Sequence, residues 1–495
     1  MQTGAASEGL FVEERRARQP WSLPWPLLAG VLVSLLVATP CLIQRRIQAS
    51  DLPSHVYNIW LTQLTRAGRA PGLELRAQWS NTLFDRILEA CIGAFGFAAG
   101  EKVAVIAAVL IFFWGLFALA SSAAGEPAWK IAPLIAAFCY GWAFSAGFMN
   151  MYLSLGLMFL ALTVIRDSRG WQLLWLLPLL AAISAAHLLG TAGVLALGAL
   201  FALLRWKSGW PWELGAIGAL AACTGGALFW IRTHLPTMEE AADLSQRMCG
   251  FDQLVLYRHL YLWAAFAAMG AAFVVVASTL ARERGAAFVR VRLWLLLAAA
   301  GALLLPILPN GFVTRSSGLI GLIPPRISMI VAAAFLCTLA GMARRWWHCL
   351  LLSLAVVPFL VLYCQDVQSI NRLELTMTRA VQLLPPGARV ITAINLPPQV
   401  SRLSIAHLLD RACIGHCYAY GNYEPGSGQF RLRAVRRNAI VTTSWQNAIQ
   451  MESGNYLPER SEQPLYSLYF CQPGARDLCM APLPAREEVS PVLSK

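Results

Sequence analysis

Charged residues are scarce in this sequence. Asp, Glu, Lys and Arg together make up 13% of its 495 residues, whereas soluble globular domains carry about 25%. Hydrophobic residues make up 57%, and the mean hydropathy is +0.56. This composition excludes an ordinary water-soluble enzyme and predicts a protein embedded in a membrane.

Acidic residues are the scarcer of the two charge signs. The chain has 26 Asp and Glu against 39 Lys and Arg, which gives a formal net charge of +13. Most of the short Lys and Arg clusters lie at the ends of apolar runs, where cytoplasmic positive charge sets the orientation of membrane helices. We therefore expect membrane lipids or a lipid phosphate as the counterpart of this charge, and no nucleic acid.

Several catalytic and metal-binding motifs are also missing. The sequence contains no GxSxG nucleophile turn, no glycine-rich phosphate-binding loop and no DxD pair. A hard divalent cation such as Mg²⁺ or Mn²⁺ needs oxygen ligands, which Glu74, Asp85 and Glu89 could supply. The motif CIGHC at residues 413–417 fits no common zinc pattern. We assign no metal ligand and keep a divalent cation as an open alternative.

Long apolar runs dominate the chain up to residue 364. Each extends over about 17 to 23 residues, enough to cross a hydrocarbon core of about 30 Å. We predict an all-α polytopic membrane protein with about eleven transmembrane helices. The expected spans are residues 22–43, 102–121, 131–148, 150–165, two within 171–205, 211–231, 259–280, 291–308, 327–343 and 347–364.

The distribution of basic residues predicts the orientation. Arg15 and Arg16 lie in a tail, residues 1–21, that precedes the first span, and every short connection on the same side contains Lys or Arg. We expect a cytoplasmic N-terminus and a transmembrane region over residues 22–364. The first apolar run shows no clear cleavage site, so we interpret it as a retained anchor, in the inner (plasma) membrane of a bacterium.

Residues 365–495 differ in composition from the preceding part. The segment ARVITAI (388–394) is rich in branched residues, as is typical of a β-strand, and turn-rich sequence follows. We expect a small extracytoplasmic α/β domain here. An even number of cysteines fits disulfides in an oxidising compartment. The four are Cys413, Cys417, Cys471 and Cys479.

Four cysteines allow three disulfide pairings. A bond between Cys413 and Cys417 within one helix would strain the geometry of the disulfide. We therefore favour bonds that join this pair to Cys471 and Cys479.

The first outer loop, residues 44–100, is the main candidate for a functional site. It is long for a connection between spans and has helical patterns of its own, so we expect interfacial helices in it. Asp51 and His55 share a face if DLPSHVYNIWLTQL is helical. They are candidate catalytic residues, with Asp51 as a general base. Alternatively, Asp51 only caps an interfacial helix, since Asp followed by Pro suits a helix start.

Further candidates lie in other outer segments. Asn81 and Asp85 form a second polar pair with a spacing of four. His187 lies within an apolar run, where an ionisable residue suggests function, although a His bonded to a backbone carbonyl is a common alternative. Arg315 and Arg326 lie in one outer connection. An interfacial arginine suits a lipid phosphate or serves as a membrane anchor.

The layout resembles that of the GT-C-type integral membrane glycosyltransferases, which use polyprenyl- or dolichyl-phosphate sugars. The shared features are an acid in ASDLPSHVYN after the first span, the GFMNMYLSLGL hairpin, SAAHLLG, and IPPRIS before a late span. An outer C-terminal region that opens with PPGARVITA follows. The likeness covers residues 1–395 in layout, through short and degenerate motifs.

The resemblance implies transfer of a hexose or pentose from a polyprenyl-phosphate donor to a glycan, lipid or protein acceptor on the outer face of the membrane. Asp51 would then act as the base and Arg326 would contact the lipid phosphate. The chain lacks the adjacent acid pair (DD, DE or ED) of such loops, for which His55 could compensate. The residues expected to bind substrate are Asn81, Asp85, His187, Arg315 and Arg326.

Two other functional classes remain open. A transporter of lipid-linked glycans or small molecules predicts charged residues along a path through the spans and repeat symmetry, whereas the expected spans are nearly free of charge. A non-catalytic scaffold or assembly protein, with the C-terminal region as its binding surface, is compatible with the missing acid pair.

Overall fold

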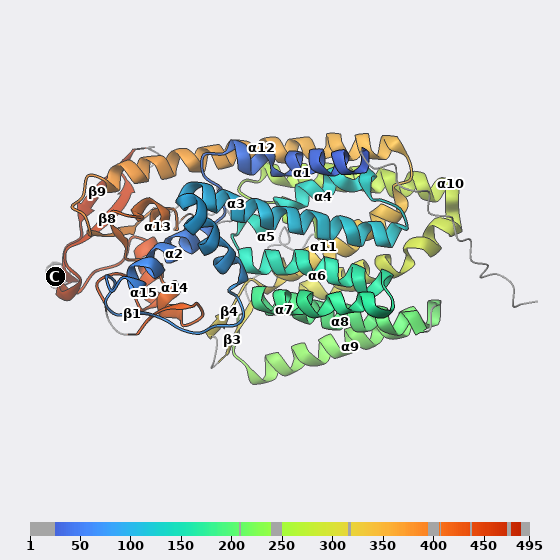
Figure 1. Ribbon diagram of the computed structural model, residues 1–495, viewed down its shortest axis with the longest axis horizontal. Coiled ribbons are helices and arrows are strands. Elements are labelled where there is room, and N and C mark those ends of the chain that lie inside the picture. Colours follow the sequence, from blue (N-terminus) through green and yellow to red (C-terminus); the bar gives the residue numbers. More distant parts are fainter. Residues whose placement is uncertain are drawn as a thin grey trace, which may run out of the picture.

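The chain is a predominantly helical membrane protein. Eight of the helices in the described part of the chain are long and apolar enough to cross a membrane. The long helices run alongside one another, and the C-terminal elements gather at one end of them (Figure 1). The computed structural model describes residues 25–206, 209–238, 250–314, 318–394, 405, 407–435, 438–472 and 477–486.

The eight long segments come from seven continuous helices, because α10 supplies two. They are α3 (Leu83–Ala124), α6 (Met149–Asp167), α8 (Leu188–Trp206), α9 (Trp210–His234), α10 (Leu260–Leu304), α11 (Ile323–Met342) and α12 (Trp346–Val381). Shorter helices in the same part of the chain are α1 (Trp25–Ile43), α2 (Leu52–Arg66), η1 (Trp129–Ile131), α4 (Ala132–Cys139), α5 (Trp142–Ser145), η2 (Gly170–Trp175), α7 (Leu176–Ala186), η4 (Phe251–Leu254) and η5 (Leu305–Ile307).

The apolar runs coincide with helical segments, with two differences in continuity: residues 131–148 are divided, and the runs at 259–280 and 291–308 lie on the single helix α10. Residues 171–205 fold as two helices that meet at His187, whose backbone is extended. Residues 131–148 form α4 and α5 instead of one long helix. They separate at Gly141, where a Cβ would lie 3.0 Å from a backbone oxygen of η4. The close approach leaves little room for a side chain at Gly141, so η4 can pack beside the junction of α4 and α5.

Two helices extend beyond the expected apolar spans. α3 begins within the first loop and bends at Gly96, whose φ is +75°, a conformation that glycine adopts without strain. α12 continues past residue 364 as far as Val381. Both extensions reach the end of the bundle at which the C-terminal elements lie (Figure 1).

The C-terminal region contains a mixed four-stranded sheet of order β6-β5-β8-β9. β5 is parallel to both of its neighbours, with Arg389 opposite Tyr418 and Leu465, and β9 is antiparallel to β8. β5 is the strand expected at ARVITAI. The elements of this region are β5 (Arg389–Thr392), α13 (Leu408–Cys413), β6 (Tyr418–Ala419), α14 (Glu424–Ser427), β7 (Leu432–Ala434), α15 (Trp445–Glu452), η6 (Arg460–Glu462), β8 (Leu465–Phe470) and β9 (Leu478–Pro482).

A second, three-stranded sheet joins two loops beside the long helices. Its strands are antiparallel and follow the order β2-β3-β4. They are β2 (Thr237–Met238), β3 (Gly311–Thr314) and β4 (Gly318–Ile320).

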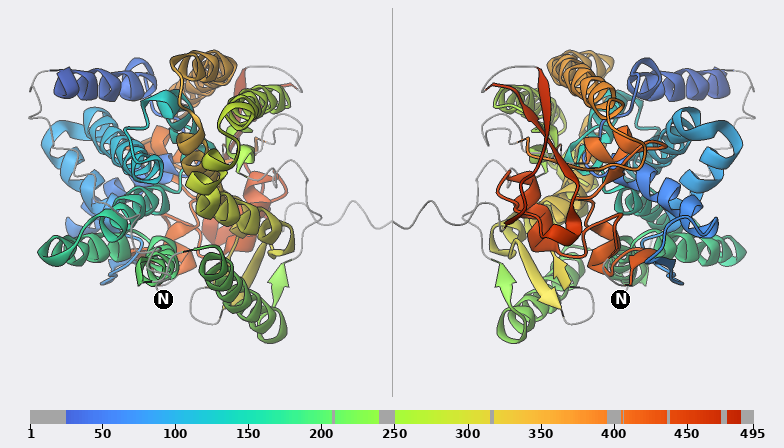
Figure 2. Two further views of the ribbon diagram at one scale, coloured as in Figure 1. Left: turned by 90° about the vertical axis from the view of Figure 1, so that its right-hand side faces the viewer. Right: turned by 90° about the vertical axis from the view of Figure 1, so that its left-hand side faces the viewer.

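The first loop and the C-terminal region form one packed unit. Strand β1 (Leu73–Leu75) of the loop pairs antiparallel with β7, with Glu74 opposite Arg433. Helix α2 packs against α13, and Tyr57, Leu61 and Leu408 share a buried apolar cluster. Figure 2 shows the loop and the C-terminal elements beside one another at this end of the molecule. The loop is therefore a structural partner of residues some 360 positions further along the chain.

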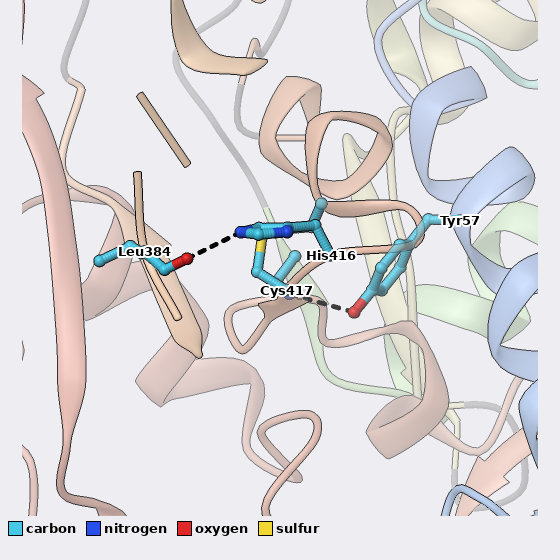
Figure 3. Close-up of a disulfide and its surroundings, with 6 residues drawn as sticks. Tyr57, Leu384, His416 and Cys417 are labelled. Carbon is cyan, nitrogen blue, oxygen red and sulfur yellow. Dashed lines mark hydrogen bonds between the residues drawn. A yellow bond between two sulfur atoms is a disulfide. The ribbon is translucent and has the colours of Figure 1, made fainter. Parts of the chain in front are cut away.

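The structure corrects the disulfide pairing. Cys413 is bonded to Cys417, and Cys471 to Cys479. The predicted pairing, with bonds between the two pairs, is therefore wrong. α13 ends at Cys413, and the chain turns immediately after it, which brings the two Cα atoms within 4.7 Å without a shared helix. Beside this bond, the Tyr57 hydroxyl accepts a hydrogen bond from the backbone of the following strand (3.0 Å) (Figure 3).

Arg411 in α13 is the centre of a buried ionic network. Its guanidinium donates to Glu374 of α12 (2.7 and 2.8 Å) and to Glu101 of α3 (2.6 Å). It also donates to the carbonyl of Ile47 (3.0 Å) and to the amide oxygen of Gln48 (3.3 Å). The Arg411 side chain is fully buried. One side chain thus joins the loop, both extended helices and the C-terminal region.

Replacing Arg411 by Leu should strongly destabilise this junction. The change leaves the buried Glu374 without its arginine partner and leaves Glu101 with the more distant Arg46 (3.8 Å). Breaking a buried ion pair typically costs about 3–5 kcal/mol. The matched control is Arg66→Leu, because Arg66 pairs with Glu89 in an exposed position and should contribute less than about 1 kcal/mol. Thermal unfolding of both purified variants in detergent measures the difference. Equal shifts for the two variants would contradict the central role of Arg411.

Candidate functional site

Asp51 lies at the start of α2, but its carboxylate does not cap the helix. The Asp51 backbone is itself helical (φ −88°, ψ −11°), and no hydrogen bond joins its side chain to the first turn. The capping alternative therefore does not describe this side chain. Among the described residues, no group donates a hydrogen bond to the Asp51 carboxylate. It remains available to a substrate.

The GFMNMY hairpin fixes the backbone position of Asp51. The N–H of Ser50 donates to the carbonyl of Ser145 (2.8 Å), and the N–H of Asp51 donates to that of Ala146 (3.2 Å). Gly147 follows with a φ of +80°. A Cβ at this glycine would lie 2.3 Å from the Asp51 nitrogen, so the close approach requires glycine.

A cavity of about 190 Å³ opens beside Asp51. Apart from Asp51, its walls come from the C-terminal region, namely from β5, α13, α15 and the segments around β6 and α14. The cavity therefore exists only where the first loop and the C-terminal region meet. Its other polar and aromatic lining residues are Thr392, His407, Asp410, Tyr423, Trp445 and Glu452.

Arg326, in the first turn of α11, supplies a positive charge near Asp51. Its guanidinium carbon lies 4.1 Å from the centre of the Phe148 ring. Its buried Nε–H has no hydrogen-bond partner among the described residues. The Arg326 charge acts on both Asp51 and His187. Because an unpartnered buried donor is costly, this N–H is suited to an oxygen of an anionic ligand.

Two polar side chains of η4 hold the IPPRIS segment that carries Arg326. The Gln253 amide donates to the carbonyl of Pro325 (2.8 Å) and accepts from a backbone N–H of α5 (3.1 Å). The Ser328 hydroxyl donates to Asp252 (2.6 Å). Hydrogen bonds therefore fix the chain on both sides of Arg326.

His55 is paired with Asp85 and does not face the site as a free base. Its Nδ1 lies 2.6 Å from Asp85 Oδ1, and the side-chain amide of Asn150 donates to Asp85 Oδ2 (2.9 Å). Burial disfavours the charged imidazole, but the adjacent Asp85 carboxylate outweighs it and raises the pKa of His55 to about 9. His55 is therefore a fixed positive charge at neutral pH.

A second histidine–carboxylate pair lies on the opposite, C-terminal wall. Nδ1 of His407 lies 2.8 Å from Oδ2 of Asp410, and the Ser54 hydroxyl donates to the same carboxylate. Burial disfavours the imidazolium, but Asp410 raises the pKa of His407 to about 10. Asp51 thus lies near two imidazolium groups, each of which already has a carboxylate partner.

Glu424 links α2 to the C-terminal wall. The side-chain amide of Asn58 donates to its carboxylate (2.5 Å), and the amide of Asn422 donates to Asn58 Oδ1 (3.2 Å). Burial raises the pKa of Glu424 to about 7, although His55 and His407 oppose the rise. Residues 422 and 424 are therefore both bonded to α2 through a single asparagine.

The surroundings of Asp51 set its proton affinity. Burial raises the pKa of the Asp51 carboxyl, while the charges of His407, His55 and Arg326 oppose that rise. The net effect is a raised pKa, so the Asp51 carboxyl binds a proton more readily than a carboxyl in water.

The structure brings four of the predicted site residues together: Asp51, His55, Asp85 and Arg326. His187 lies within reach of the Arg326 charge, and its Nδ1 accepts a hydrogen bond from the backbone N–H of Leu189 (3.0 Å).

Two predicted site residues lie elsewhere. Asn81 precedes α3, with a φ of +57°, so it does not share a helical face with Asp85. No hydrogen bond connects its side chain to the described residues around Asp85. Arg315 lies outside the described residues.

The C-terminal contributors were not predicted as site residues. His407, Asp410, Tyr423 and Glu424 all lie more than 350 positions from Asp51 along the chain. The one signal in the sequence is HLLD (407–410), a His and an Asp with a spacing of three, which lie close together in a helical turn. Nothing in the sequence shows that this turn faces the first loop.

No three or more His, Cys, Asp or Glu side chains are placed to hold a metal ion in the described ranges. Comparison of the chain with protein-family models, curated proteins and solved structures found no match. The function of the site is therefore argued from its own residues.

The raised histidine pKa values predict that stability depends on pH. A histidine whose pKa in the folded state exceeds its unfolded value of about 6.5 stabilises the fold fully below that pH. The stabilisation is lost as the pH rises through the folded-state pKa, about 9 for His55 and about 10 for His407. We expect thermal stability to fall over this interval.

Asp85→Asn should remove the pH-dependent stabilisation that His55 contributes to the fold. At low pH this stabilisation is on the order of 3 kcal/mol, because the pKa of His55 rises from 6.5 to about 9 and one pKa unit corresponds to about 1.4 kcal/mol. The stability profile of the variant should therefore be flatter in thermal unfolding between about pH 6 and pH 10. Asp167→Asn, at an exposed position, is the control and should keep the wild-type slope. Parallel profiles for Asp85→Asn and wild type would contradict the pairing.

Proposed function

We propose that this protein is a membrane glycosyltransferase that moves a sugar from a polyprenyl-phosphate donor to an acceptor hydroxyl on the outer face of the membrane. The observation that carries the proposal is the Asp51 carboxylate. It neither caps α2 nor accepts a hydrogen bond from the described residues, and it faces a cavity within reach of the Arg326 charge. A free base and a free cation are the two groups that this transfer needs.

The transfer would proceed by displacement at the anomeric carbon. Asp51 accepts the proton of the acceptor hydroxyl as the acceptor oxygen bonds to that carbon. The bond between the anomeric carbon and the donor phosphate oxygen breaks, and its electron pair leaves with the polyprenyl phosphate. The Arg326 guanidinium, whose Nε–H lacks a partner, stabilises the charge that develops on the phosphate.

The paired histidines support this assignment of roles. Both imidazolium groups are bonded to their own carboxylates, so neither is free to take the acceptor proton. Their charges instead oppose the effect of burial on Asp51. We assign His55 as a positioning and electrostatic residue and Asp51 as the base. Asp85 and Asn150 hold His55 in place.

The proposal includes an orientation. The eleven apolar segments would cross the membrane with the N-terminus in the cytoplasm, because their inner connections carry Lys or Arg. Residues 365–495 would then form an extracytoplasmic domain of the inner membrane of a bacterium. Two observations support this orientation: the disulfides lie in that region, as is usual for oxidising compartments, and Asp51 and Arg326 lie on its side of the bundle.

Asp51→Asn should abolish transfer without unfolding the protein. The amide cannot take the acceptor proton, so we expect at least about a 100-fold loss of rate, with an unchanged thermal unfolding temperature. The assay is transfer of label from a panel of polyprenyl-phosphate sugars in membrane vesicles, with Asp167→Asn as control. Unchanged turnover in Asp51→Asn would contradict the assignment of Asp51 as the base and favour a non-catalytic scaffold.

Arg326→Ala should abolish retention of the lipid phosphate. Mass spectrometry of lipids that co-purify with the protein should detect a polyprenyl phosphate, or its sugar conjugate, in wild type and not in the variant. Lysine keeps the charge but lacks the planar donor fork, so Arg326→Lys should retain only part of the lipid. The control is Arg69→Ala, an exposed arginine of the first loop. Equal retention in all four proteins would contradict the role of Arg326.

A further inference from the structure

We infer that the cavity beside Asp51 binds one uncharged, hydroxyl-bearing sugar ring of the acceptor, held against the aromatic pair Tyr423–Trp445. The inference rests on the proposed function, since it names the acceptor class of the same site. It assigns the selection of the acceptor to the C-terminal region, whereas the donor phosphate is assigned to Arg326.

The aromatic pair provides an apolar surface of the kind that a sugar ring covers with its C–H groups. The rings of Tyr423 and Trp445 lie edge to face, with centroids 4.3 Å apart and planes at 76°. Trp445 keeps 45% of its surface exposed, although both rings line the cavity. An exposed tryptophan with a polar edge and an apolar face is typical of a ligand-contacting residue.

Hydrogen bonds hold the chain next to each ring. Tyr423 lies between Asn422 and Glu424, both of which are bonded to Asn58 of α2. Trp445 follows the N-cap of α15, where the Ser444 hydroxyl accepts from a backbone N–H one turn on (3.2 Å). A chain segment that is already ordered loses little conformational freedom when a ligand binds.

The polar groups of the cavity favour a neutral, hydrogen-donating ligand. Among the described residues that line the cavity, Asp51, Asp410 and Glu452 carry carboxyl groups, and His407 carries an imidazolium that is already paired with Asp410. Carboxylates accept hydrogen bonds from sugar hydroxyls. An anionic sugar such as a uronic acid would meet like charge in a partly buried site, which is unfavourable.

The size of the cavity limits the ligand to one ring. Its volume is about 190 Å³, whereas pockets for drug-sized molecules measure about 300–1,000 Å³. The cavity therefore holds one ring of a longer acceptor, with the rest outside. Asp51 lines the cavity and acts electrostatically on the Tyr423 phenol, so a hydroxyl of a ring held by Tyr423 lies toward the base.

Saturation-transfer NMR on the full chain in lipid nanodiscs tests this inference without turnover. The probes are the methyl glycosides of glucose, mannose and galactose. Methyl glucuronide serves as the negatively charged comparison. We expect at least one neutral glycoside to bind and the glucuronide to bind at least about tenfold more weakly. A tenfold change corresponds to about 1.4 kcal/mol.

Matched tryptophan variants localise the binding. Trp445→Ala should weaken the neutral glycoside at least about tenfold, whereas Trp79→Ala, at an exposed tryptophan outside the cavity lining, should leave it unchanged. Ile449→Trp tests the same cavity by filling it, since Ile449 lines the cavity and is half exposed. Ile449→Trp should also abolish binding. The test therefore still works if Trp445→Ala fails to fold.

The outcomes separate this inference from the proposed function. Binding that is lost in the cavity variants but kept in Trp79→Ala supports the acceptor pocket even if no transfer is ever detected. Absence of binding by every neutral glycoside, equal binding of the glucuronide, or indifference to both cavity variants would overturn it. Transfer with lipid-phosphate donors would then still stand on the Asp51 and Arg326 variants.

Discussion

The buried charge of Arg411 is the constraint on which the arrangement of the site depends. Its guanidinium is bonded to Glu101 of α3, to Glu374 of α12 and to the chain at residues 47–48. Both carboxylates are buried and paired with Arg411, and Glu101 has a second, more distant partner in Arg46 (3.8 Å), so removal of the Arg411 cation would be costly. α13 is held against the loop as a result, and with it the cavity wall formed by His407 and Asp410.

The site is assembled from three parts of the chain that fold for different reasons. Asp51 is placed by backbone hydrogen bonds to the hairpin at residues 145–147, and Arg326 by the contacts of η4. The C-terminal wall is placed by Arg411 and by the pairing of β1 with β7. None of these placements uses the Asp51 carboxylate itself.

The sequence predicts the parts that depend on local pattern. Apolar runs indicate the membrane helices, DLPSHVYNIWLTQL indicates α2, and ARVITAI indicates β5. Asp51 and Arg326 were predicted as site residues because a charged group beside an apolar run stands out in the sequence. The disulfide pairing was wrong because it depends on where α13 ends. The partners of Asp51 on the far wall were missed since contacts over more than 350 positions leave no local signal.

The pairing of charges explains why one acid differs from the rest. His55 and His407 each have a carboxylate within 2.8 Å, Glu424 accepts from Asn58, and Glu374 accepts from Arg411. Asp51 alone among these acids lies near several cations without a hydrogen bond to any described group. Its charge is stabilised at a distance, so the cost of burying it is reduced while its oxygens stay open. The other acids are held by direct hydrogen bonds, whereas the described residues hold the Asp51 carboxylate by electrostatic interactions alone.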